Sequence, residues 1–157
     1  MAKFPESNTI NFDNLFELSQ STDQPLWGTM TLQHMVEHLE LVYSRCYDAN
    51  AYEIVSPAEK LGKLKVFLKG KHALVRNFNA PFIPNEPVPY KYKSLAEATS
   101  ALLNARKAFN AFFADKSADF TVNHIVFGAL TYPEWTRFHD KHVGHHLAQF
   151  GMWNLEA

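Results

Sequence analysis

The chain has 157 residues, of which 46% are hydrophobic, 14% aromatic and 20% charged, and its net charge is −1. This length and apolar content predict a single domain, residues 1–157, with a core of its own, and the balanced charge argues against a nucleic-acid-binding protein. Because no uncharged apolar run approaches the roughly 18 residues of a membrane span, and because the first residues lack the apolar stretch of a signal peptide, we expect a cytoplasmic protein that does not bind membranes.

Helix signals dominate the sequence. Taken in chain order, the expected helices lie near Asn11–Ser21, Thr29–Asn50, Pro57–Arg76, Leu95–Asp115 and Tyr132–Trp153. Three segments carry the pattern of a capping box, in which a hydroxyl residue caps the helix and a glutamate three positions later reaches back to it: Ser56–Glu59, Ser94–Glu97 and Thr131–Glu134. Such a cap typically contributes about 1 kcal/mol. The single cysteine, Cys46, falls at an apolar helical position, where we expect it to be buried and unreactive.

The connection at residues 77–93 contains four prolines and four aromatic residues. This segment has too many prolines for a helix and too many aromatic residues for a disordered linker, so we expect an ordered loop across one end of the molecule. No segment shows the alternation typical of a strand. The predicted fold is therefore all-α, an up-and-down four-helix bundle with an extra short helix and a proline-rich loop.

The last predicted helix carries half of the histidines in the chain. On a helix that advances about 100° per residue, His142 and His146 lie at the centre of the apolar stripe, whereas His139 and His145 lie at its edges and Lys141 lies on the solvated side. Two histidines four positions apart present their imidazoles about one turn apart, so both can bind the same ion. His142 and His146 are therefore candidate metal ligands.

A third ligand is expected on the helix near residues 29–50, where His38 lies closer to the apolar face than His34. An unpaired buried polar group costs about 1–3 kcal/mol, so three imidazoles in one layer of the core need a common partner. A divalent cation is such a partner. The sequence thus predicts a metal site made of His38, His142 and His146.

Other polar residues are candidates for contact with these ligands or with a substrate. Gln149 lies one turn beyond His146 on the same face, where it either orients a ligand or is an ordinary polar core residue. His34 or His124 could supply a fourth ligand, which would close the site. Glu37 is a weaker candidate for a general base, because its helical position favours exposure to solvent. No catalytic residue is assigned.

Three segments, Leu26–His38, Asn123–Trp135 and Phe138–Gly151, together resemble the DinB-like (YfiT-like) superfamily of small helical metalloproteins, in a largely uncharacterised branch. They lie in that order across nearly the whole chain, and the last contains the pattern His, three residues, His, two residues, Gln. The resemblance implies a four-helix core in which His38 supplies one ligand and His142 and His146 supply two. It also implies nickel or zinc as the ion, frequent homodimers and, for members with known activity, thiol-dependent transfer or hydrolysis.

Two classes of function follow from these patterns. The first is a metal-dependent enzyme whose open three-histidine site activates a thiol or water for transfer or hydrolysis on a small-molecule substrate, with a low-molecular-weight thiol as one option. The alternative is a non-catalytic helical module in which the ion only holds the helices together, or in which aromatic helix faces serve dimerisation.

Overall fold

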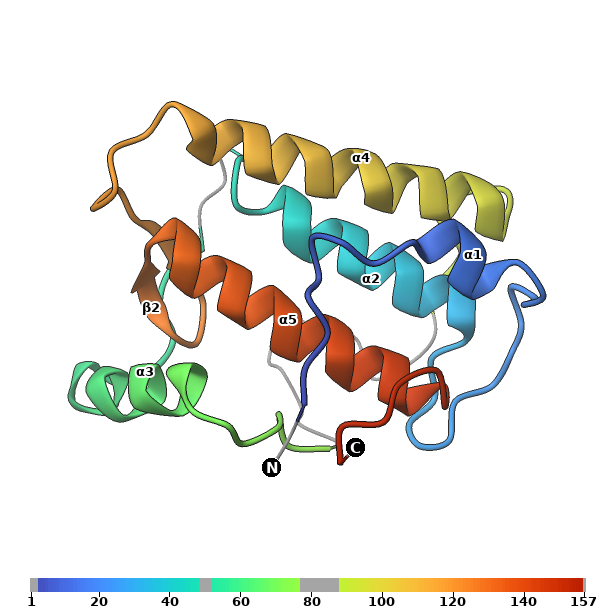
Figure 1. Cartoon of the computed structure of the whole chain (residues 1–157), viewed down its shortest axis with the longest axis horizontal. Coiled ribbons are helices and arrows are strands. Elements are labelled where there is room, and N and C mark those ends of the chain that lie inside the picture. Colours follow the sequence, from blue (N-terminus) through green and yellow to red (C-terminus); the bar gives the residue numbers. More distant parts are fainter. Residues whose placement is uncertain (1–2, 49–51, 77–87, 157) are drawn as a thin grey trace.

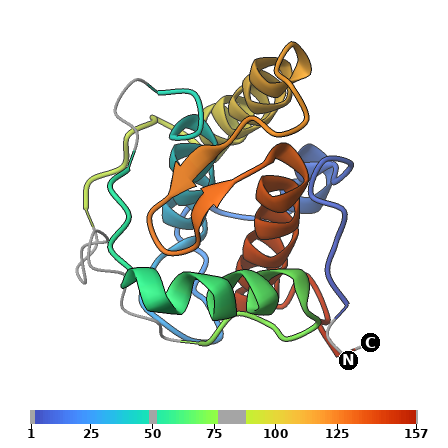
Figure 2. The same cartoon turned by 90° about the vertical axis from the view of Figure 1, so that its left-hand side faces the viewer.

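The structure, a computed structural model, describes residues 3–48, 52–76 and 88–156. Its elements in chain order are α1 (Phe12–Phe16), α2 (Leu32–Ser44), the 3₁₀ turn η1 (Ala58–Lys60), α3 (Leu61–Lys69), α4 (Leu95–Ala114), β1 (Val122–His124), β2 (Gly128–Leu130) and α5 (Tyr132–Gln149). The axes of α2, α4 and α5 are roughly aligned, with α5 running opposite to α2 and α4 (Figure 1), and α3 lies across them (Figure 2). Within these ranges, no helix combines the length and apolar character that crossing a membrane requires.

The core lies between α2, α4 and α5. Tyr43 of α2, Phe109 of α4 and Trp135 of α5 are all at most 1% exposed, and burying a large apolar side chain contributes about 1.5–3 kcal/mol. Helix α2 packs closely against α4, whereas the backbones of α2 and α5 are held farther apart. Side-chain rings therefore fill the space between α2 and α5.

The predicted all-α, up-and-down four-helix bundle is wrong. Strands β1 and β2 form an antiparallel sheet, so the described chain combines five α-helices with a small two-stranded sheet in a mixed fold; the paired residues are Val122 with Leu130, Asn123 with Ala129 and His124 with Gly128. Strands of three residues are too short to show an alternating pattern. Turn chemistry specifies the hairpin instead, because Gly128 adopts a left-handed φ of 80°, a conformation that glycine reaches without steric cost.

Local signals predicted the helix starts better than the helix ends. Helix α4 was predicted to within one residue, whereas α3 ends at Lys69, before an extended Gly70, and does not continue to Arg76. Helix α5 stops before Trp153 because Gly151, at φ 71°, turns the chain back, and the next N–H donates to the carbonyl of Leu147 at 2.8 Å. This arrangement is a glycine-terminated helix cap. Most of the predicted proline-rich loop, residues 77–87, lies outside the described residues.

The three predicted capping boxes have different outcomes. Thr131 and Glu134 form a complete box, in which the Thr131 N–H donates to the Glu134 carboxylate at 3.0 Å. Ser94 accepts from the N–H of Glu97 at 3.1 Å and forms half of one. Ser56 does not cap a helix, because its hydroxyl donates to a carbonyl of the hairpin loop at 2.7 Å, and η1 begins without a side-chain cap.

The carboxylate of Glu134 also joins α5 to α3, at 3.4 Å from Lys65 Nζ and 3.2 Å from Lys69 Nζ. We expect Glu134→Ala to lower the free energy of unfolding by about 1–2 kcal/mol, mostly through the lost cap, since exposed ion pairs contribute little. Urea denaturation measures this change. Glu134→Gln keeps an oxygen that can accept from Thr131 and removes only the charge, so it should lose much less; equal losses in the two variants would contradict the dominance of the cap.

Candidate metal centre

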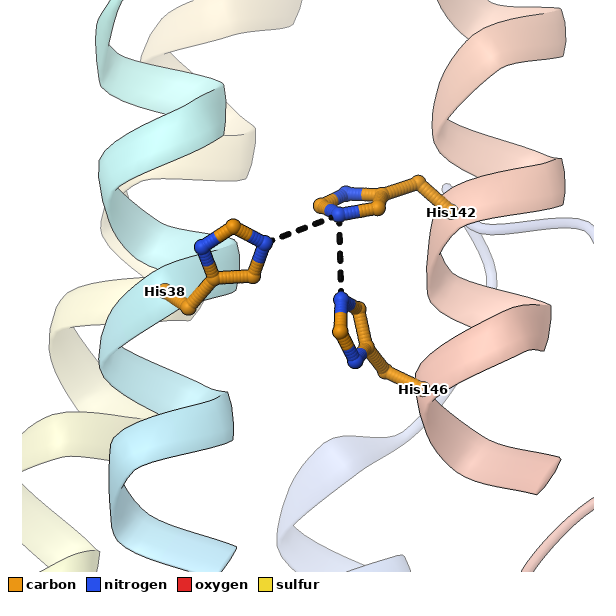
Figure 3. A group of neighbouring side chains, drawn as sticks. All are labelled: His38, His142 and His146. Carbon is orange, nitrogen blue, oxygen red and sulfur yellow. Dashed lines mark hydrogen bonds between the residues drawn. The ribbon is translucent and has the colours of Figure 1, made fainter. Parts of the chain in front are cut away.

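Three histidines from two helices meet between α2 and α5. His38 of α2 and His142 and His146 of α5 direct their Nε2 atoms toward one another (Figure 3). The Nε2 atoms of His38 and His142 lie 2.9 Å apart, and those of His142 and His146 lie 3.1 Å apart. One possible ligand atom from each residue lies within 4.8 Å of the other two. The structure thus brings together the three histidines that the sequence singled out.

Helix geometry and the local packing explain this convergence. His142 and His146 are one turn apart on α5 and are 8% and 7% exposed. On this helix Gly144 faces the N-terminal segment, where an added Cβ would lie 2.8 Å from the side chain of Pro5, so that segment covers the side of α5 away from the cluster. His38 is only partly buried and is the least buried of the three histidines.

The three rings are neutral at pH 7. Burial lowers the pKa of His38 to about 4, and the nearby His145 adds to the effect. Burial also holds the pKa values of His142 and His146 well below the usual range, with further contributions from neighbouring histidines. Burial is the largest cause in each case, because it disfavours the charged imidazolium. All three histidines can therefore offer a nitrogen lone pair.

Two of the three separations between these nitrogens fit a bound cation. A neutral imidazole has one N–H, and that of His146 is on Nδ1, which donates to Oε1 of Gln149 at 2.8 Å. Its Nε2 therefore faces the other two rings with a lone pair. Two nitrogens bound to one ion at about 2.0–2.1 Å, with angles of about 90–110°, lie roughly 2.9–3.4 Å apart. Both Nε2 separations that involve His142 fall in this range.

His139 is buried more deeply than predicted. It was expected at the edge of the apolar stripe, yet it is 1% exposed, and its ring stacks on Tyr43 with 3.7 Å between centroids. Neither ring nitrogen has a hydrogen-bond partner among the residues described. Burial holds its pKa well below the usual range, and the nearby His124 adds to this. His139 belongs to the aromatic core rather than to the cluster.

A cavity of about 510 Å³ lies next to His145, and the three clustered histidines are not among its lining residues. His145 connects the two, because it lines the cavity and its ring packs edge-on against His146 at 5.1 Å. Trp27 also lines the cavity, where its ring packs edge-on against that of His145 at 5.9 Å and the guanidinium of Arg76 lies 4.0 Å from its ring centre. A cavity of this size can hold a small molecule.

His34 and Glu37 hold a distant segment of the chain against α2. The Nε2–H of His34 donates to the carbonyl of Val88 at 2.7 Å. Its Nδ1 is therefore an acceptor, and it lies against Thr31 at the start of α2. The carboxylate of Glu37 accepts from the backbone N–H groups of Lys91 and Tyr92, each at 3.0 Å. In this arrangement neither side chain is available as a ligand or as a general base.

His124 organises the β-hairpin. Its Nδ1 accepts from the N–H groups of Val126 at 3.0 Å and Phe127 at 3.2 Å, and its ring packs against Phe138 at 4.3 Å. Burial lowers its pKa to about 3. His124 therefore stabilises the turn and lies apart from the three clustered histidines.

Sequence reasoning missed the contact between Gln149 and the segment before α2. Nε2 of Gln149 donates to the carbonyl of Trp27 at 2.9 Å, while the N–H of Leu26 donates to the carbonyl of Gln149 at 2.7 Å. The detectable signal was Gly28, which directly follows Trp27 and has a left-handed φ of 81°.

The fold and this site define a mixed, mainly helical domain with a buried cluster of three histidines. A family model described as a protein of unknown function (DUF1569) matches residues 3–152, and the chain belongs to this family. No curated protein and no solved structure matches the chain. None of these comparisons links it to the DinB-like superfamily.

Proposed function

We propose that this protein is a divalent-metal-dependent enzyme in which His38, His142 and His146 hold a nickel or zinc ion for transfer or hydrolysis on a small substrate. The observation that carries this proposal is that the Nε2 atoms of three neutral imidazoles, from two helices, converge on one point. When bound, such an ion supplies Lewis-acid chemistry that makes a thiol or water nucleophilic at neutral pH.

The surrounding residues favour an open site over a closed one. Structural zinc sites usually have four protein ligands, whereas catalytic sites have three and keep a position for substrate. Among the described residues, His34 and His124 make their contacts elsewhere, and the metal-competent group contains three histidines. Three neutral ligands also leave the charge of the cation uncompensated, which favours Lewis-acid chemistry. The cavity beside His145 supports a substrate of small-molecule size.

The resemblance to the DinB-like superfamily supports three further parts of the proposal. These are membership of a divergent branch of that superfamily, a low-molecular-weight thiol as co-substrate, and assembly into a homodimer. We also infer a cytoplasmic location. Cys46 is free and buried, and burial raises the pKa of its thiol, so it suits a reducing compartment.

Titration with cobalt(II) tests the proposal on protein produced without a histidine tag and stripped of metal. We expect visible absorption bands that saturate at about one ion per chain, together with a higher melting temperature. An ion present at 100 times its Kd stabilises the folded state by about 2.7 kcal/mol. Failure to bind cobalt, nickel or zinc would contradict every metal-dependent function.

The same cobalt protein distinguishes an enzyme from a non-catalytic module. At an open site, added thiol or azide should shift the absorption bands, because exogenous ligands can enter the coordination sphere. A spectrum that does not respond to either ligand would assign the ion a purely stabilising role.

A further inference from the structure

Both ends of the Gln149 amide are engaged in hydrogen bonds. Its Oε1 lies 2.8 Å from Nδ1 of His146, and its Nε2 lies 2.9 Å from the carbonyl oxygen of Trp27. The residue is 5% exposed, so water competes little for these contacts. Because a carbonyl can only accept, the Trp27 contact requires the amide nitrogen on that side. The amide oxygen must therefore face His146.

This orientation determines the tautomer of His146. With an oxygen acceptor as its partner, Nδ1 carries the proton and Nε2 keeps its lone pair, which faces His142 at 3.1 Å. Partners of this kind fix the ring orientation and tautomer of metal-binding histidines. His142 differs, because its Nδ1 is buried without a hydrogen-bond partner in the described structure.

The segment that orients Gln149 is itself fixed in place. The N–H of Leu26 donates to the backbone carbonyl of Gln149 at 2.7 Å, so the two segments are joined on both sides of Trp27. At Gly28 an added Cβ would lie 2.8 Å from Nε2 of Gln149. Glycine at this position therefore allows both the left-handed turn and the close approach to the amide.

We propose that Gln149 is a positioning residue of the histidine cluster: anchored by the Trp27 carbonyl, it holds His146 as the Nδ1–H tautomer with Nε2 free for a cation, and Gly28 makes this anchor possible. The role in metal binding rests on the proposed function. The control of the His146 tautomer does not, because it follows from the protein contacts alone.

Tautomer measurement in the metal-free protein tests the anchor directly. Two-bond ¹H–¹⁵N NMR spectra of the imidazoles should show His146 protonated at Nδ1 in the wild type. In Gln149→Leu the acceptor is lost, and His146 should shift toward the Nε2–H form. Gln149→Glu keeps an oxygen that accepts from Nδ1–H, although it loses the donor to the Trp27 carbonyl, and it should keep the tautomer. A purely space-filling role for Gln149 would leave the tautomer unchanged in all three proteins.

Metal affinity provides the second measurement. Loss of a hydrogen-bond partner of a metal ligand typically weakens metal binding by about 10–100-fold. We expect this loss of zinc affinity in Gln149→Leu. Gln149→Glu should bind zinc at least about tenfold more tightly than the leucine variant. Gly28→Ala should also weaken binding, although it leaves every ligand in place. The matched control is Gly62→Ala on α3, where an added Cβ meets nothing within 4 Å, and it should bind like the wild type.

The two readouts separate this inference from the proposed function. If the wild type binds no metal, but Gln149→Leu changes the His146 tautomer, the proposed function fails and the control of the tautomer by Gln149 is supported. If the wild type binds zinc and Gln149→Leu keeps both the zinc affinity and the His146 tautomer, the positioning role of Gln149 is refuted and the proposed function stands. Should Gln149→Leu not fold, Gly28→Ala decides the question, and unchanged zinc affinity and tautomer in that variant would overturn the anchor.

Discussion

Replacing His142 or His146 by alanine should reduce zinc or nickel affinity by more than about 100-fold, because each change leaves only two protein ligands for the ion. His38→Ala should have the same effect, since its Nε2 lies 2.9 Å from that of His142. Competition with a chromophoric chelator measures the affinities. Circular dichroism, recorded on the same samples, confirms that each variant is folded.

The neighbouring histidines of α5 provide matched controls. His145→Ala should retain affinity within a few-fold of the wild type, because its ring lines the cavity and only packs against His146. For His139 the better control is phenylalanine, since alanine would leave a hole in the aromatic core and cost about 3–5 kcal/mol as in comparable ring deletions. Equal losses of affinity in the ligand and control variants would refute the assignment of His142 and His146 as ligands.

The metal-free protein should lose stability steeply below pH 6.5. His124 and His139 are buried as neutral rings, with pKa values lowered to about 3 for His124 and well below the usual range for His139. In the unfolded chain these histidines bind protons near pH 6.5, so below that pH the unfolded state holds more protons and is favoured. Their contribution is complete above pH 6.5 and is lost as the pH falls toward their folded-state pKa values.

The expected loss is large compared with the stability of a typical domain. Each such histidine contributes up to about 1.4 kcal/mol per pH unit. Because the unfolded histidines are only half protonated at pH 6.5, the two together remove about 3 kcal/mol between pH 6.5 and pH 5, against typical stabilities of 5–15 kcal/mol. Urea denaturation of chelator-treated protein at several pH values measures this slope. The clustered histidines increase this slope as well, and they do so equally in the wild type and in His139→Phe.

His139→Phe isolates one of the two contributions. Phenylalanine keeps a ring against Tyr43 and removes two buried nitrogens that have no partner in the described part of the chain. The proton uptake on unfolding near pH 5 should therefore fall by about one proton per molecule relative to the wild type. An unchanged slope would mean that His139 is already protonated, or solvated, in the folded protein.

Local sequence signals predicted the parts of the structure that depend on one helix at a time. The spacing of His142 and His146 placed both rings on one face of α5, and the hydroxyl cap at Ser94 marked the start of α4. Cys46 was also predicted to be buried, and it is 3% exposed. The choice of His38 over His34 followed from the apolar face of α2. In each case a local signal, either the periodicity of one helix or its N-cap, contained the necessary information.

The parts that were mispredicted depend on contacts between distant segments. A helical wheel assumes one buried side, but α5 is covered on several sides, so Lys141, predicted to face solvent, is 0% exposed. Its ammonium group donates to the carbonyls of Phe67 and His72, both at 2.8 Å, and burial lowers its pKa to about 8. The hairpin likewise depends on His124, whose side chain accepts hydrogen bonds from the backbone of the turn. This contact leaves no alternating pattern in the sequence.

The three clustered histidines are widely separated in the chain, because His142 follows His38 by 104 positions. During translation the two histidines on α5 are added only after α2 and α4 are complete. A nascent chain therefore cannot form the complete cluster until α5 has been synthesised. If the cluster binds the proposed ion, a polypeptide that ended before α5 would hold only one of the three ligands and should not retain it.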